Sequence, residues 1–320
     1  MKRFEIKRGN EMFSLIKALT TDQSTLDLYY IKKRKEAYKK THGIPRHIRL
    51  HNFLHWFLLP CIKALRIAGK RNLIIYCDRR TKTHNPTIYA CTHIGGVDIE
   101  TAFEAIKYPC WLFLGDPREV YKNLDGFMLG LNGVICLDSK DKDDRRIAKE
   151  TAIQLLKHGG NLLIYPEGVW NISENLPVGK LFIGTAEMAI QSKADIVPIA
   201  VEFYGNDLCV AIGKNMDISK FAIEDKYTVN QLLRDELATL KWTIWEQRGI
   251  SKRALFPDNY SETFVNKIIY GNKETSYTVQ DVLNTMFIDK SITEYSQAFE
   301  HLNNIKPNLQ TAFLFNKRSK

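Results

Sequence analysis

Short apolar runs alternate with helical patterns along the middle of the chain, between residues 72 and 212. The runs are rich in β-branched and aromatic residues, which favours strands, and the segments between them space apolar residues as helices do. This alternation predicts an α/β fold, with a mostly parallel central sheet flanked by helices. The predicted strands are Leu73–Tyr76, Thr87–Cys91, Cys110–Leu114, Gly133–Leu137, Asn161–Tyr165, Ile196–Phe203 and Leu208–Ile212.

Helix start and stop signals separate these strands. Asp98 is placed to cap one helix, and Asp143 or Asp144 to cap another that Gly159-Gly160 would stop. Gly205-Asn206 between the last two strands predicts a hairpin at the edge of the sheet. The predicted helices are Glu11–Leu19, Asp98–Lys107, Asp143 or Asp144 to His158, Lys180–Lys193, Val229–Gln247, Val279–Phe287 and Ile292–Leu302.

The pattern divides the chain into three regions. Residues 1–70 are basic, amphipathic and helical, residues 71–220 form the α/β domain, and residues 221–320 are a helical C-terminal extension of unknown role. A chain of 320 residues is long enough to bury a full core.

Positive charge is concentrated in one segment. From Ile31 to Lys82 fifteen Lys or Arg face two acids, a net charge of +13 against +10 for the whole chain, so the remainder carries −3. The same segment holds the apolar, aromatic stretch Phe53–Ile67, which Pro60 interrupts. Such a segment can lie in a membrane interface and attract anionic lipid. Two alternatives stay open, a helical hairpin packed on the core with a solvated basic face, and, less favoured because no binding motif accompanies it, a nucleic-acid arm.

The cysteines and the N-terminus bear on location. The six cysteines include no C-x-x-C pair, which favours reduced residues of a cytosolic protein over zinc ligands or disulfides. The charged N-terminus has no apolar core behind it, so we expect no signal peptide, and no apolar run is long enough for a transmembrane helix.

Polar side chains follow the ends of several predicted strands. Because the carboxyl ends of parallel strands gather at one edge of a sheet, we expect these side chains to meet in one crevice. They are His93 and Asp98 after the second strand, Asp116, Arg118 and Glu119 after the third, Asp138, Ser139 and Lys140 after the fourth, and Glu167 and Gly168 after the fifth.

His93 is the best candidate for a general base. It is the only one of eight histidines with an Asp five positions later, and Gly95-Gly96 supplies the bend that could bring Asp98 back to the imidazole. A carboxylate would fix the tautomer of the ring and stabilise the imidazolium. The alternative is that Asp98 only caps a helix and that His93 is an ordinary loop residue.

The loop Pro166-Glu167-Gly168 is a candidate for substrate binding. Proline stiffens it, Glu167 offers a hydrogen-bond acceptor, and Gly168 lets the backbone approach a ligand. Arg118, Lys140 and Lys180 are candidate anion contacts, although each alone is more typical of a solvated cation. The chain has no G-x-S-x-G, Walker A, G-x-G-x-x-G or H-E-x-x-H motif, and a metal site at His93 and Asp98 lacks a third ligand, so we expect no metal and no cofactor.

Four blocks in order resemble the glycerolipid acyltransferases, the lysophosphatidic acid acyltransferase-like enzymes. The resemblance covers roughly residues 50–212 and includes Arg118-Glu119-Val120 as a further family feature. The blocks are Thr92-His93-x4-Asp98, Gly133 to Asp138, Tyr165-Pro166-Glu167-Gly168 and Val197-Pro198-Ile199.

The resemblance implies acyl transfer from acyl-CoA or acyl-carrier protein, as co-substrate, to the hydroxyl of a lysophospholipid such as 1-acyl-glycerol 3-phosphate. His93 would be the base and Asp98 its partner, and the second and third blocks would hold the acceptor. The family works at the cytoplasmic face of the membrane. This favours a peripheral protein whose partners are membrane lipids, and no nucleic acid.

Three departures from the family pattern concern the acceptor. Thr92 stands where the family usually has Asn, Ser139 stands where it has Arg, and Val169-Trp170 replace Thr-Arg. Because those arginines are the expected phosphate contacts, Arg118 would carry phosphate binding with Lys140 or Lys180. The alternatives are acylation of another lysolipid or lipid alcohol, and a non-catalytic protein of this fold that binds anionic lipid.

Overall fold

The computed structural model describes residues 21–115, 124–174, 176–249, 251–270 and 278–286. Contacts group the described residues up to Met286 into one compact unit. The predicted helices Glu11–Leu19 and Ile292–Leu302 lie outside the described residues. The division into regions 1–70, 71–220 and 221–320 stays a prediction.

The described residues form a seven-stranded sheet in the order β1-β7-β6-β2-β5-β3-β4. Strands β6, β2, β5, β3 and β4 are parallel to one another, whereas β7 is antiparallel to β6 and parallel to β1. The predicted mostly parallel α/β sheet is therefore confirmed. The strands are β1 (Asn72–Asp78), β2 (Thr87–Cys91), β3 (Trp111–Gly115), β4 (Val134–Leu137), β5 (Leu162–Ile164), β6 (Asp195–Tyr204) and β7 (Asp207–Ile212).

The predicted hairpin is present, but it does not form the edge of the sheet. Strands β6 and β7 pair antiparallel on either side of Gly205, whose φ is +62°. Strand β1 pairs with the outer side of β7, so β1 and β4 are the two edges. The sequence pattern could not show this, because β1 and β7 are more than a hundred residues apart.

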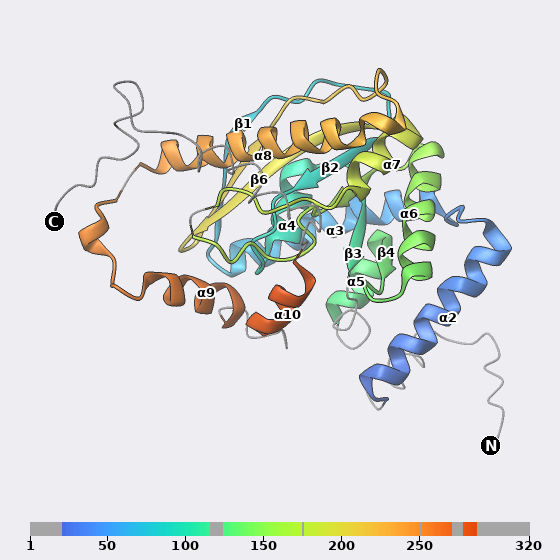
Figure 1. Cartoon of the computed structure of the whole chain (residues 1–320), viewed down its shortest axis with the longest axis horizontal. Coiled ribbons are helices and arrows are strands. Elements are labelled where there is room, and N and C mark those ends of the chain that lie inside the picture. Colours follow the sequence, from blue (N-terminus) through green and yellow to red (C-terminus); the bar gives the residue numbers. More distant parts are fainter. Residues whose placement is uncertain (1–20, 116–123, 175, 250, 271–277, 287–320) are drawn as a thin grey trace, which may run out of the picture. The chain divides into compact units, whose positions relative to one another are not determined.

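Helices cover both faces of the sheet (Figure 1). Along β2, Ile88 and Ala90 point to a core shared with α6, α7 and α8, while Tyr89 and Cys91 point to a second core shared with α4, which α3 and α5 join at its margin. All five residues of β2 are buried, as expected for a central strand of a doubly covered sheet. The helices are α2 (Gln23–Thr41), α3 (Ile48–Ala68), α4 (Asp98–Ile106), α5 (Leu124–Asn132), α6 (Lys142–Lys157), α7 (Gly184–Ser192), α8 (Lys226–Arg248), α9 (Tyr260–Tyr270) and α10 (Val279–Thr285).

The observed helices correct several predicted boundaries. Helix α6 is capped by Asp141, whose side chain accepts from the N–H of Asp144, and not by Asp143 or Asp144. Helix α7 begins at Gly184 and not at Lys180. Helix α3 continues through Pro60, which is exposed. No individual helix was predicted at α2, α5 or α9, although α2 lies in the region 1–70 that was expected to be helical.

Helix α2 is fastened to α6 by a buried ion pair. Asp144 has no exposed side-chain surface, and its carboxylate accepts from Arg34 Nε at 2.9 Å and Nη2 at 2.6 Å. The same carboxylate accepts from the backbone N–H of Asp138 at 2.7 Å, which ties the loop after β4 to both helices. Lys35 adds a partly exposed bond to Asp141 at 2.8 Å. Asp144 therefore joins three segments that are distant in the sequence.

We expect Asp144→Ala to lower the free energy of unfolding by about 3 kcal/mol, because it leaves the Arg34 charge without its partner in a largely buried place. Urea unfolding followed by circular dichroism measures this change. Asp143→Ala is the matched control: its side chain is exposed, and we expect a loss below about 1 kcal/mol. Equal losses for the two variants would show that the buried pair has no special role.

Candidate active site

The loop after β2 brings His93 and Asp98 together. Asp98 Oδ2 lies 2.8 Å from His93 Nδ1, and the carboxylate is almost fully buried, with 1 % of Asp98 exposed. Because a carboxylate can only accept, Nδ1 carries the proton and Nε2 keeps a lone pair. The arrangement fits a general base with an orienting carboxylate.

Asp98 also shapes the loop that it follows. Its Oδ2 accepts from the backbone N–H groups of Ile94 at 3.0 Å and Gly95 at 2.9 Å. The helix cap is Val97, so the predicted cap at Asp98 is wrong: Asp98 is the first helical residue, and it binds the preceding loop. Gly95 and Gly96 have φ of +78° and +63°, the left-handed region that glycine enters without strain. The tight turn requires both glycines and brings the carboxylate to the imidazole.

The loop after β5 is hydrogen-bonded to the His93 loop. Strand β5 pairs with β2 in parallel, with Ala90 opposite Ile164, so the two loops leave neighbouring strand ends. Glu167 Oε1 accepts from the backbone N–H of His93 at 3.0 Å, and Oε2 accepts from Gly179 at 2.7 Å. The predicted convergence of His93, Asp98 and Glu167 is what the structure shows.

Glu167 contacts the backbone, which differs from the contact that the sequence suggested. Only 3 % of the residue is exposed, and burial raises the pKa of the Glu167 carboxyl while the donated hydrogen bonds from His93 and Gly179 act against that rise. Both oxygens already accept from backbone N–H groups. The observed contacts assign Glu167 to positioning the His93 loop, and a direct contact with the acceptor stays a prediction.

Gly168 makes a close approach to the protein itself. Its φ is +70°, and a Cβ at this position would come within 2.5 Å of the Phe182 ring. Glycine is therefore required at position 168, as predicted. The group that lies close to it in the structure is the Phe182 ring. Gly168 is exposed, so its backbone also stays open to a ligand.

Aromatic rings surround the imidazole. His93 stacks on Tyr165 with ring centroids 4.3 Å apart, and Trp170 lies edge-on to it at 6.3 Å. A Cβ on Gly95 would come within 3.1 Å of the Trp170 indole, so this ring lies directly over the turn. Burial raises the pKa of the Tyr165 hydroxyl well above its usual value, so this group stays protonated. Trp170 is thus a wall of the site, at the position where the family pattern has an arginine.

The predicted site residues after β4 are bonded within their own turn. Asp138 Oδ1 accepts from the Lys140 backbone N–H at 2.7 Å, the Asp138 N–H donates to Asp144, and the Ser139 carbonyl accepts from Arg145. Strand β4 is the sheet edge, separated from β2 by β5 and β3. Arg118, with Asp116 and Glu119, lies outside the described residues. Among the described loops, a hydrogen bond links the loops after β2 and β5. The part of the expected crevice that involves the loop after β3 stays a prediction.

Sequence reasoning missed one charged group near the site. Lys241 of α8 is 2 % exposed, and its Nζ bonds the Val201 carbonyl at 2.9 Å and Glu202 Oε1 at 2.6 Å. Its positive charge acts against the rise of the Glu167 pKa. A signal was available, because Lys241 is four residues after Leu237 and one after Leu240, on the apolar side of the helix.

No metal site is built from the described residues: they contain no group of three or more His, Cys, Asp or Glu side chains that could hold an ion.

We expect Glu167→Gln to lower kcat by about 10²-fold with little change in the KM for the acceptor, because the amide would place a donor against a backbone N–H and shift His93. Steady-state kinetics with varied acceptor separates the two constants. Glu236→Gln, at an exposed carboxylate of α8, is the control and should leave both constants unchanged. A raised KM with an unchanged kcat would instead support direct acceptor contact by Glu167.

Comparison with known proteins gives a family match within the α/β domain. Residues 72–202 match the family model described as Acyltransferase. Among solved structures, the crystal structure of the 1-acyl-sn-glycerophosphate (LPA) acyltransferase PlsC from Thermotoga maritima is similar, with a TM-score of 0.45 and 13 % sequence identity over 72 % of this chain and 100 % of that chain. No curated protein matches the chain. The family match spans the four sequence blocks and the paired His93 and Asp98, and residues 72–202 therefore form a domain similar to the Acyltransferase family.

Proposed function

We propose that this acyltransferase moves an acyl chain from acyl-CoA or acyl-carrier protein to the hydroxyl of a lysophospholipid, with 1-acyl-glycerol 3-phosphate as the first acceptor to test and phosphatidic acid as its product. The observation that carries the proposal is the 2.8 Å contact between His93 Nδ1 and the buried Asp98 carboxylate.

The proposed mechanism uses His93 twice. Its Nε2 takes the proton from the acceptor hydroxyl as the oxygen attacks the thioester carbonyl, and Asp98 stabilises the imidazolium. The tetrahedral intermediate then expels the thiolate, which receives that proton from His93. The new ester bond forms as the thioester bond breaks, and no acyl-enzyme is needed. Tyr165, stacked on the imidazole, and Glu167, bonded to the His93 N–H, hold the ring during both transfers.

The residues around His93 bear mainly on the identity of the acceptor. Trp170 and Ser139 replace the arginines that would contact a phosphate, and Trp170 lies beside His93. Lys140 and Lys180 are exposed cations that could bind a phosphate in their place, together with Arg118. A lysolipid without a phosphomonoester, or another lipid alcohol, is the second candidate acceptor because an indole offers an apolar, uncharged wall.

Helix α3 provides the proposed contact with the membrane. Phe53, Trp56, Phe57 and Leu65 are each more than half exposed, and most of them share one face of a helix that packs its other side on α4 and α5. Large exposed apolar patches mark interaction sites, and Lys and Arg around this one would attract anionic lipid. Among the described residues no helix is both long and apolar enough to cross a membrane. We propose peripheral binding at the cytoplasmic face.

We expect His93→Ala to lower the rate of acyl transfer by about 10³-fold or more while the melting temperature stays near that of the parent, because it removes the base. Purified protein is supplied with acyl-CoA or acyl-carrier protein over lysolipids with and without a phosphomonoester, and product lipids are followed by mass spectrometry. A variant as active as the parent would remove His93 from the chemistry.

We expect Trp170→Arg to raise kcat/KM for 1-acyl-glycerol 3-phosphate relative to a lysolipid without a phosphomonoester by about tenfold, because a guanidinium adds a charge-assisted contact with phosphate. The ratio of the two constants is the measurement. Trp242→Arg, at an exposed tryptophan of α8, is the matched control and should leave the ratio unchanged. A ratio that does not move would show that the indole position does not meet the acceptor headgroup.

We expect Phe57→Glu to weaken binding to vesicles of anionic lipid by about tenfold or more, because it removes an aromatic ring from the apolar face and adds a repelled charge. Vesicle cosedimentation measures the change, with Trp242→Glu as a matched exposed aromatic outside α3. Equal weakening by both variants would argue against α3 as the membrane contact.

A further inference from the structure

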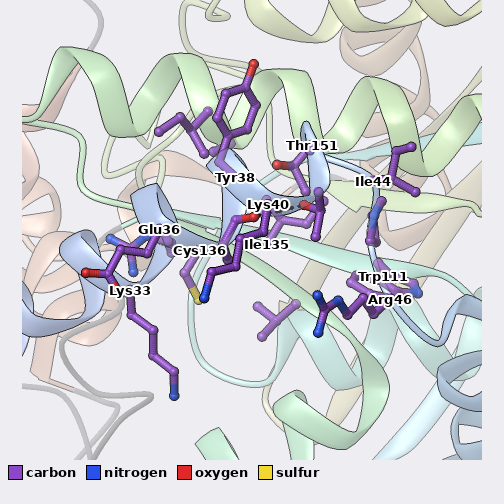
Figure 2. Close-up of a pocket in the computed structure, with 18 residues that line it drawn as sticks. Lys33, Glu36, Tyr38, Lys40, Ile44, Arg46, Trp111, Ile135, Cys136 and Thr151 are labelled. Carbon is purple, nitrogen blue, oxygen red and sulfur yellow. Dashed lines mark hydrogen bonds between the residues drawn. The ribbon is translucent and has the colours of Figure 1, made fainter. Parts of the chain in front are cut away.

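A pocket lies at the edge of the sheet, apart from the His93 loop. It has a volume of about 490 Å³ and is enclosed by α2, the loop after it, the edge strand β4 and α6 (Figure 2). None of the residues that line it belongs to the loops of His93 or Glu167. The volume is within the range of small-molecule sites, about 300–1,000 Å³.

The pocket combines an apolar floor with cationic walls. Val134 and Ile135 of β4 and Ala148 of α6 form part of the floor. The cations of the wall have no ion-pair partner among the described residues. One carboxylate, that of Glu36, also lines the pocket. The adjacent Arg34 is paired with Asp144. Those cations are Lys33, Lys40 and Arg46, and Figure 2 shows their charged ends on the same side of the pocket, opposite Tyr38 and Thr151.

The walls of the pocket are built in advance. Lys33, Ala37 and Lys40 follow one another at spacings of four and three residues, so they share one face of α2. That helix is held in place by the buried pair of Arg34 and Asp144. A ligand would therefore meet a helix whose backbone is already in place, although the exposed lysine side chains on it still have to be ordered.

The chemistry of the lining selects an anionic amphiphile. The cations attract a phosphate, and the apolar floor offers burial to a chain that a free phosphate lacks. The loop that carries Arg46 leads directly into α3, whose exposed face begins at Leu50 and Phe53. The wall of the pocket is therefore followed directly in the sequence by the helix that carries the exposed apolar face.

We propose that this pocket binds the headgroup and upper acyl chain of one anionic phospholipid of the membrane, as a docking ligand distinct from the acceptor at His93. The bound lipid fixes α2 and the start of α3 against the bilayer. This goes beyond the proposed acyl transfer, because it requires neither acyl donor nor turnover.

The test uses full-length protein and no acyl donor. Isothermal titration is done with dihexanoyl-phosphatidylglycerol below its micellar concentration, with dihexanoyl-phosphatidylcholine and with glycerol 3-phosphate. We expect the anionic lipid to bind about tenfold more tightly than either of the other two, since each lacks one of the two features that the pocket recognises. Equal binding of glycerol 3-phosphate would replace the lipid site with a simple phosphate site and overturn the proposal.

Two neighbouring lysines of α2 give a matched pair of variants. Lys40 lines the pocket, whereas Lys39 is equally exposed and does not. We expect Lys40→Gln to weaken binding of the anionic lipid by about five- to tenfold and Lys39→Gln to leave it unchanged, although both remove one charge. If both variants weakened lipid binding equally, the lipid would be attracted to the basic helix in general. That result would overturn the proposed binding in the pocket.

A third variant fills the pocket without changing charge. Ala37→Trp should weaken binding of the anionic lipid by about tenfold, while Ala222→Trp, at an exposed alanine outside the pocket, should not. Melting temperatures show that each variant is folded. Unchanged binding by Ala37→Trp would place the lipid elsewhere. Lipid binding is measured without turnover. If the parent protein proved to have no acyl-transfer activity, the binding results would still test the pocket.

Discussion

Two backbone N–H groups, those of His93 and Gly179, meet on the single carboxylate of Glu167, and the site is built around that contact. Burying a carboxylate is costly unless its oxygens are hydrogen-bonded, so the contact persists only where the two loops are held close together. The parallel pairing of β2 and β5 brings them close. The Asp98 carboxylate and the Asn171 N–H, which bonds the His93 carbonyl at 2.8 Å, fix the same loop at further points. A base held in this way loses little freedom when an acceptor arrives.

The sequence predicts the architecture and the pairing of His93 with Asp98, because both depend on residues that are close together in the chain. Strand and helix periodicity predicts the parallel sheet, and the spacing of His93, the two glycines and Asp98 predicts their meeting in one loop. Strand order is not local information. Nothing in the chain near residue 137 indicates that β4 is an edge strand, so Asp138, Ser139 and Lys140 were expected beside His93 although β5 and β3 lie between.

The features that sequence analysis missed depend on partners far away in the chain. Helix α2 has weak apolar periodicity, and its place in the fold depends on the pairing of Arg34 with Asp144, 110 residues later. Asp144 was interpreted as a helix cap because acids near a helix start usually serve that purpose. Lys241 was given no role by the sequence analysis, yet its amine reaches the Val201 carbonyl and Glu202. Charged residues on apolar helix faces are the signal that could have pointed to these pairs.

The departures from the family pattern differ in physical meaning. Thr92 is fully buried, and its hydroxyl accepts from the Val201 N–H at 3.0 Å, so it extends the pairing of β2 with β6 and has a structural reason to be there. Ser139 belongs to a turn at the sheet edge, where the Asp138 N–H donates to the Asp144 carboxylate and the Ser139 carbonyl accepts from Arg145. Trp170 alone of these three contacts the ring of His93 in the described structure. A change of acceptor, which stays a proposal, would therefore have its physical basis at Trp170, because of the substituted side chains only this indole lies against the imidazole.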